Sequence, residues 1–171
     1  KSTSGAIKTF RTAVATTGEY GVYHGGTAAG VLSAVVVTMN RVDGIFESEL
    51  GISLELVDNN DLIVFTDTIT DPFTGNNDAS VLIDESQVEI DARIGAENYD
   101  VGHTLSTGAG GLASLGAVCR PGFKAQGVTG AGRPEGDFFD VDYVAHELGH
   151  QFAADHTWNG SGGGCGPQQR G

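Results

Sequence analysis

The apolar positions between residues 28 and 39 repeat with the period of an α-helix. Six of them fall at i, i+3, i+4, i+7, i+8 and i+11, namely Ala28, Val31, Leu32, Val35, Val36 and Met39. Side chains at these spacings share one face of a helix and bury that face against a core. The pattern therefore predicts a long helix with one packed side.

Two further helices are predicted later in the chain. One covers Val81–Ile94, where the preceding Asn77 or Asp78 can cap the first turn. The other covers Asp140–Phe152 and takes its first residue or Asp142 as the N-cap, because aspartate accepts hydrogen bonds from the free amides of a first turn.

Five segments have the β-branched, aromatic or alternating residues that are typical of strands. They are Phe10–Thr16, Ile52–Leu56, Leu62–Thr66, Tyr99–Thr107 and the glycine-rich Gly111–Val118. The glycines of the last segment allow another backbone to approach closely, which favours an edge strand. Strands that alternate with helices predict a single α/β domain, in which a twisted, mostly parallel sheet with an antiparallel edge strand is backed by helices.

The charge of the chain narrows the classes of partner. Twenty-two acidic and nine basic residues among 171 give a net charge of −13, which repels a phosphate backbone and excludes nucleic acid. The longest apolar stretch, Val31–Met39, is far shorter than the roughly 20 residues that cross a bilayer, so no membrane association is expected. The acidic, lysine-poor composition suits an exported bacterial protein, and we expect a secreted monomer.

The segment with the clearest chemistry is HELGHQFAADH, which begins at His146. On a helix, His146 and His150 lie about 6 Å apart along the axis and on nearly the same side, so both rings can face one zinc ion. Glu147 is placed to take a proton from a water molecule that the ion acidifies. A third ligand is still needed, and either His156 or Asp155 can supply it if the chain leaves the helix after His150.

This segment resembles the metzincin signature HExxHxxGxxH, and it is most similar to the reprolysin-like (adamalysin-type) metalloproteases of bacteria. The resemblance implies a metzincin-like zincin fold, a zinc cofactor held by His146, His150 and His156, and Glu147 as the general base. It also implies a protein or peptide as substrate. The segment GLASLGAVC at 111–119 is similar to the edge strand of that family, which pairs with the substrate backbone. The implied substrate-binding residues are Gly111, Leu112, Ala113 and Ser114.

The chain departs from the family pattern in two places. Ala153 stands where the family has the glycine of a sharp turn, and an L-residue forced to positive φ there costs about 1–2 kcal/mol. The family also has a methionine-containing turn after the third histidine, whereas the one methionine of this chain is Met39. We therefore expect residues 1–171 to form a single catalytic domain that lacks its C-terminal part with the methionine turn.

Several assignments stay open on the sequence alone. Cys119 and Cys165 can pair with each other, pair with cysteines outside the chain, or remain free thiols. The acidic stretches Asp58–Asp61 and Asn76–Asp78 can bind calcium, as relatives do, but surface charge explains them more simply. His24 and His103 each lack partners at ligand spacing, and we expect both residues to be structural.

The leading functional prediction is a zinc-dependent endopeptidase. The alternative from another class is a catalytically silent, zinc-containing module that binds peptides without cutting them. A third hypothesis is a zinc hydrolase whose substrate is a non-peptide amide or a cell-wall link instead of a protein. Serine and cysteine hydrolases have no support, because GxSxG does not occur and neither cysteine lies in a known catalytic pattern.

Overall fold

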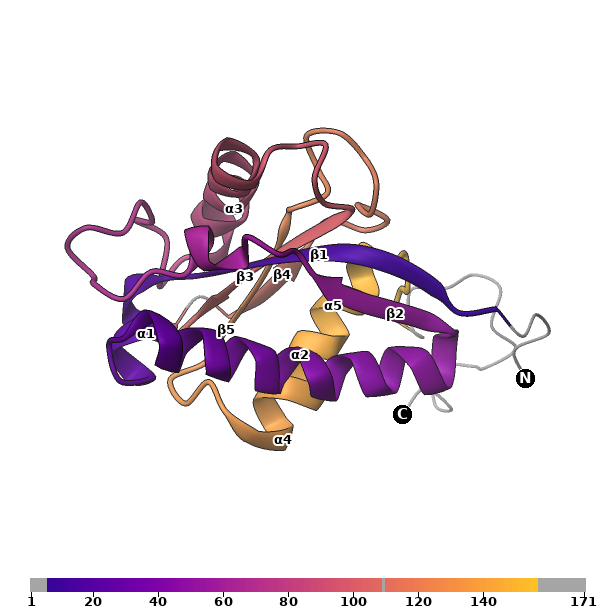
Figure 1. Cartoon of the computed structure of the whole chain (residues 1–171), viewed down its shortest axis with the longest axis horizontal. Helices are drawn as coiled ribbons and strands as arrows, with labels where there is room; N and C mark the ends of the chain where they lie inside the picture. Colours follow the sequence, from indigo (N-terminus) through magenta and orange to yellow (C-terminus); the bar gives the residue numbers. More distant parts are fainter. Residues whose placement is uncertain (1–5, 109, 157–171) are drawn as a thin grey trace.

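A five-stranded sheet forms the centre of the protein in the computed structural model, which describes residues 6–108 and 110–156 (Figure 1). The strand order is β2-β1-β3-β5-β4, in which β4 runs antiparallel to β5 and the other pairs are parallel. The strands are β1 (Lys8–Thr16), β2 (Ile52–Leu56), β3 (Val101–Ser106), β4 (Gly111–Ala113) and β5 (Gly127–Gly130). The predicted α/β class and the antiparallel edge strand are confirmed.

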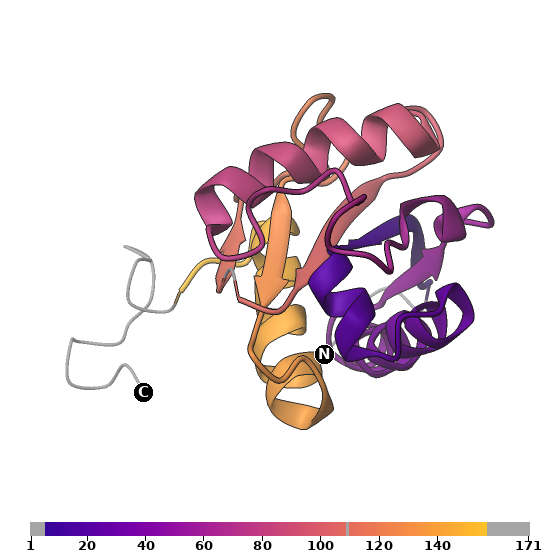
Figure 2. The same ribbon diagram turned by 90° about the vertical axis from the view of Figure 1, so that its left-hand side faces the viewer.

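Helices cover both faces of this sheet. Figure 2 shows α3 on one face and α2, α4 and α5 on the other. The helices are α1 (Gly18–Tyr23), α2 (Ala28–Leu50), α3 (Ala79–Ile94), α4 (Gly136–Phe139) and α5 (Ala145–Gln151), with a 3₁₀ turn η1 (Asn60–Ile63) and a π-helical turn η2 (Asp140–Val144). Each face therefore has its own apolar core, one under α3 and one shared by α2 and α5.

The predicted stripe of α2 faces the sheet. Val31, Val35 and Met39 are buried there, and the helix is capped by Thr27, whose Oγ1 accepts from the amide of Gly30. Gly51 ends the helix at a φ of 67°, a value that favours glycine. By length and apolar composition α2 could cross a membrane, but its buried side makes it a core helix of this fold.

Two predicted strands differ from the structure. The segment Gly111–Val118 forms a strand only as far as Ala113, because the amides of Gly116 and Val118 turn away and donate to the end of α5. The prediction of a strand over Leu62–Thr66 was wrong for most of its length. Its first residues belong to η1, and only Val64 makes a strand-like bridge.

Two short elements were not predicted. Helix α1 begins after Thr17, whose Oγ1 accepts from the amide of Tyr20 at 3.3 Å. Strand β5 has the sequence GVTG, which carries too few β-formers for its pattern to be recognised, although all of its residues are buried. Helix α1 thus has a local cap, whereas β5 owes its conformation to its pairing with β3 and β4.

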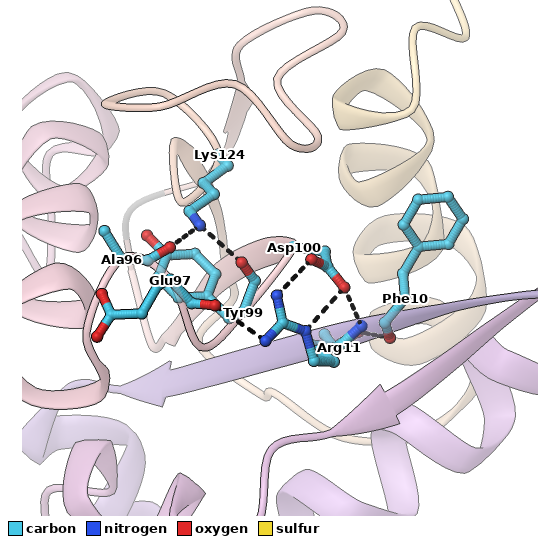
Figure 3. A network of polar contacts seen from close by, with 8 residues as sticks. Phe10, Arg11, Ala96, Glu97, Tyr99, Asp100 and Lys124 are labelled. Carbon is cyan, nitrogen blue, oxygen red and sulfur yellow. Dashed lines mark hydrogen bonds and ion pairs between the residues drawn. The ribbon is translucent and has the colours of Figure 1, made fainter.

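Two basic side chains fix the loop that leads into β3 (Figure 3). Arg11 donates to the two carboxylate oxygens of Asp100 at 2.7 and 3.1 Å and to the carbonyl of Glu97 at 2.9 Å. Lys124 donates to the carbonyl of Tyr99 at 2.6 Å and lies 4.0 Å above the centre of its ring. These contacts hold the segment around Lys124 against the start of β3.

Candidate metal centre

The helix that carries HELGH begins earlier than the sequence predicts, because α4, η2 and α5 form one continuous helical run. Asp140 and Asp142 lie inside this run, and the N-cap position belongs to Glu135, so the predicted N-cap was wrong. The side chain of Asp140 is 2% exposed and accepts from Thr38 Oγ1 at 2.7 Å and from Arg41 Nη1 at 2.8 Å. These partners on α2 satisfy the carboxylate, so it is not needed to cap a helix.

Three imidazole rings converge at the other end of the run. The Nε2 atom of His146 lies 3.0 Å from that of His150 and 3.1 Å from that of His156. One nitrogen from each ring lies within 4.8 Å of the other two, and among the described residues this is the one cluster able to hold a metal ion. Asp155, the alternative third ligand, is not part of the cluster.

The geometry of the three nitrogens fits a tetrahedral zinc site. Zinc–nitrogen bonds of about 2.0–2.1 Å in a tetrahedron place the nitrogens about 3.4 Å from one another, close to the spacing found here. His150 Nδ1 lies 2.7 Å from the carbonyl oxygen of Ala154, which can only accept, so Nδ1 carries the hydrogen and Nε2 presents its lone pair to the other rings. A neutral imidazole of this tautomer is the form that binds a metal.

A tight turn after α5 brings the third histidine to the first two. The amide of Ala153 donates to His150 O and that of Ala154 to Gly149 O, both at 2.9 Å, which is the hydrogen-bond pattern of a Schellman motif. Ala153 has a φ of 70°, as the sequence analysis required of the residue at the family's glycine position. The chain therefore makes the predicted turn without a glycine and keeps the associated strain.

Burial and neighbouring rings lower the pKa of His146. The largest cause is burial, which disfavours the charged imidazolium, and the charges of His150 and His156 act in the same direction. His150 and His156 thus both favour the neutral form of His146. In its neutral form, His146 does not need to release a proton before it binds a cation.

Glu147 lies beside the histidines, under the edge strand. The residue is 6% exposed, and burial raises its pKa while the nearby His150 lowers it to a smaller extent. A Cβ atom added at Gly111 would overlap both Glu147 Oε1 and the ring of Tyr143. The strand therefore packs directly on this carboxylate only because residue 111 has no side chain.

A hollow of about 310 Å³ lies between β4 and the three rings. Gly111, Leu112 and Ala113 line it together with Leu115, so three of the four residues predicted to bind substrate face the same space as Glu147. Ser114 does not line the hollow, and its hydroxyl and amide bond to Gln126 instead. The outer edge of β4 is the end of the sheet.

The remaining histidines and the acidic stretches do not form a metal site in the described part of the chain. His24 Nε2 lies 3.2 Å from the carbonyl of Pro134, and His103 is buried. Asn60 and Asn76, one from each of the two stretches considered for calcium, are buried and bond to neighbouring strands and loops. Calcium therefore gains no support from the structure.

One cysteine can be described. Cys119 is exposed and has no disulfide partner among residues 6–108 and 110–156. Cys165 lies outside the described residues, so each predicted pairing of these cysteines stays a prediction.

Sequence reasoning missed the buried group behind the histidines. Gln151 and His103 are both fully buried and bond to each other, although they are far apart in the sequence. A glutamine that follows a ligand histidine gives no signal of its own, and its partner on β3 was noted only as a structural histidine. Tyr143, packed on Gly111, was not singled out either.

Comparison with known proteins gives the chain its family. A search of curated proteins finds no match. The chain matches the family described as Metallo-peptidase family M12B Reprolysin-like over residues 6–170, which is nearly its whole length. Members of that family are zinc metallopeptidases that act on proteins or peptides. The fold and the histidine cluster agree with this match, and the chain belongs to the reprolysin-like M12B family of metallopeptidases.

Proposed function

We propose that the protein is a zinc-dependent endopeptidase in which His146, His150 and His156 hold the metal. The observation that carries the proposal is the convergence of three imidazole nitrogens within 4.8 Å, next to a buried carboxylate and below an edge strand. A zinc site that only supports a fold usually has four protein ligands and no adjacent base. Three histidines beside Glu147 are the arrangement of a catalytic site.

His146, His150 and His156 would hold the zinc ion, which would supply a Lewis acid able to polarise the scissile carbonyl and to acidify a water molecule. Glu147 accepts the proton that this water loses and then donates it to the leaving amine. Its burial favours proton uptake, because desolvation raises the pKa of a carboxylate towards neutrality. The contact with Gly111 holds the carboxylate in place between strand and helix.

The substrate binds along β4 in this proposal. An extended peptide adds itself to the free edge of the sheet, and the backbone of Gly111–Ala113 supplies the hydrogen bonds. Leu112 and Leu115 are 39% and 51% exposed, and they line the same hollow, so they contact apolar side chains of the peptide. The peptide then crosses the hollow between β4 and the histidines.

The proposal extends to the setting of the enzyme. With a net charge of −13 and the expected export, the protein acts as a secreted monomer on proteins or peptides. Nucleic acid, membrane and calcium have no part in the proposed reaction.

Replacement of the base separates catalysis from metal binding. Glu147→Gln keeps the size of the side chain but cannot take up a proton, so the variant should bind zinc in equimolar amount and cleave casein about 10²–10⁴-fold more slowly. Glu49→Gln, the same change at an exposed position of α2, is the matched control and should behave as the wild type. Casein cleavage by Glu147→Gln at the wild-type rate would refute the assigned base. A wild-type chain that holds zinc but never cleaves would instead identify a silent binding module.

A further inference from the structure

The residue after His150 is a fully buried glutamine whose amide group is entirely hydrogen-bonded. Gln151 Oε1 lies 2.9 Å from His103 Nδ1, and Gln151 Nε2 donates to Gly102 O at 2.8 Å and to Lys124 O at 3.4 Å. The side chain thus reaches from α5 into the sheet and to the backbone of Lys124. Buried amides with every group satisfied are rigid, because any movement breaks a hydrogen bond that water cannot replace.

His103 gives this contact a fixed direction. The ring is fully buried on β3, and its Nε2 atom lies 2.9 Å from Thr129 Oγ1 on β5. Because Gln151 Oε1 can only accept, Nδ1 of His103 carries the hydrogen and Nε2 accepts from the threonine hydroxyl. Burial lowers the pKa of His103 to about 4, which agrees with a neutral ring in a single tautomer.

The sheet has a gap where this glutamine enters. A Cβ atom added at Gly127 would overlap Gln151 Oε1 and lie 2.7 Å from His103 Nδ1. Gly127 is the first residue of β5, and only a residue without a side chain leaves room there for the amide. The space above Gly127 is filled by the side-chain amide of Gln151, next to the ring of His103.

The last turn of α5 is held from a second side as well. Gly116 N donates to His150 O at 2.9 Å and Val118 N donates to Gln151 O at 3.2 Å. Successive residues on a helix point about 100° apart, so a side chain fixed at 151 also fixes the direction in which His150 points. The Schellman turn starts from the same residues and carries His156 back to the other rings.

We propose that Gln151, supported by His103 and Thr129, is a positioning residue that sets His150 and His156 in the geometry needed for the metal. The inference rests on the proposed zinc site. Partners behind metal ligands typically contribute 10–100-fold to metal affinity, because they restrict the ligands to productive orientations. Without the amide, the end of α5 can rotate, and the rings no longer share one point.

The test replaces the amide by a chain of similar length and no hydrogen-bonding power. Gln151→Met should weaken zinc binding about 10–100-fold, measured by competition with a chromophoric chelator. The visible spectrum of the cobalt-substituted protein should also change in band position or intensity, because that spectrum reports the arrangement of the ligands. A role in folding alone would leave both readouts unchanged.

The matched control removes a buried hydrogen bond on the opposite face of β3, the strand that carries His103. Thr104 Oγ1 on β3 donates to Ser86 Oγ, which donates to Ala125 O, each at 2.7 Å and on the side of α3. Thr104→Val should lower the stability of the fold, measured by urea unfolding of the metal-free protein, yet bind zinc and cobalt as the wild type does. The comparison separates loss of stability from loss of ligand geometry.

Should Gln151→Met fail to fold, Thr129→Val carries the test, because it removes only the far end of the network. It should weaken zinc binding in the same direction by a smaller factor. Wild-type zinc affinity and an unchanged cobalt spectrum in the folded variant would overturn the inference. A wild-type chain that takes up no zinc would overturn the proposed function, and the inference with it.

Discussion

The two ends of the helical run α4–η2–α5 are fixed to the rest of the protein in different ways. At the start, the charged Asp140 is paired with Arg41, whose side chain is 37% exposed, and with Thr38 on α2. At the end, the neutral Gln151 bonds to the neutral His103 in the interior of the fold. The end nearest the three rings is therefore held by hydrogen bonds between neutral groups. The other end is held by an ion pair and a charge-assisted hydrogen bond.

This difference has a physical reason. A further charge behind the metal ligands, in addition to Glu147, would change the protonation of the imidazoles, whereas a neutral network restricts them without adding a charge. The ion pair at Asp140 belongs to the first half of the run, in η2, whereas the three rings lie at its end. The two anchors should accordingly respond to different variables, the C-terminal one to low pH and the N-terminal one to removal of a charge.

The largest expected effect is the pH dependence of the C-terminal anchor. The unfolded chain binds a proton at His103 below about pH 6.5, whereas the native chain resists it down to about pH 4, so protons favour unfolding between these values. Stability from this group is complete above pH 6.5 and falls by up to about 3 kcal/mol as the pH drops to 4. Urea unfolding of the metal-free protein across this range measures it.

The variant His103→Gln should lose this part of the pH dependence, because no proton can bind there. His24→Gln, at a partly exposed ring, is the control and should leave most of the slope in place. An unchanged slope in His103→Gln would show that the C-terminal anchor does not resist protonation as described.

The N-terminal anchor should depend on charge. Asp140→Asn keeps the shape of a buried side chain but loses its charge-assisted hydrogen bonds, which is expected to lower the free energy of unfolding by about 2 kcal/mol at pH 7. Asp137 also pairs with Arg41, but its side chain is 81% exposed, so Asp137→Asn should change stability much less. Equal losses in these two variants, measured by thermal unfolding, would contradict a special role for the buried pair.

The smallest expected effect concerns the turn that follows the C-terminal anchor. Ala153 has a φ of 70°, and Ala153→Gly relieves the strain of that conformation, so the fold should gain about 1 kcal/mol. Ala154→Gly is the control, because residue 154 has no positive φ and glycine there brings only extra freedom to the unfolded chain. A melting temperature that rises for the control and not for Ala153→Gly would argue against strain at this turn.

Local patterns in the sequence predicted the parts of the structure that depend on neighbours along the chain. The helical spacing of apolar residues predicted α2, and the alternation of apolar and polar residues predicted β2. The helical period also predicted that His146 and His150 lie together. The need for a turn at Ala153 followed from the distance between the second and third histidines, and the observed φ confirms it.

Contacts between distant segments were beyond such reasoning. An aspartate before a helix and an aspartate buried inside one look alike in sequence, so Asp140 was misassigned until its partners on α2 were known. The same holds for Gln151 and His103, because a hydrogen bond between residues on different elements leaves no local pattern. The short β5 forms only because its neighbours β3 and β4 complete its hydrogen bonds.

The central claim, that the three histidines hold a zinc ion which is required for peptide hydrolysis, is tested most directly by metal analysis combined with an activity assay. Zinc content is measured by elemental analysis, and casein hydrolysis is followed before chelation, after chelation and after zinc is added back. We expect equimolar zinc, loss of cleavage on chelation and recovery with zinc. Casein hydrolysis that persists in the metal-free protein would contradict the account.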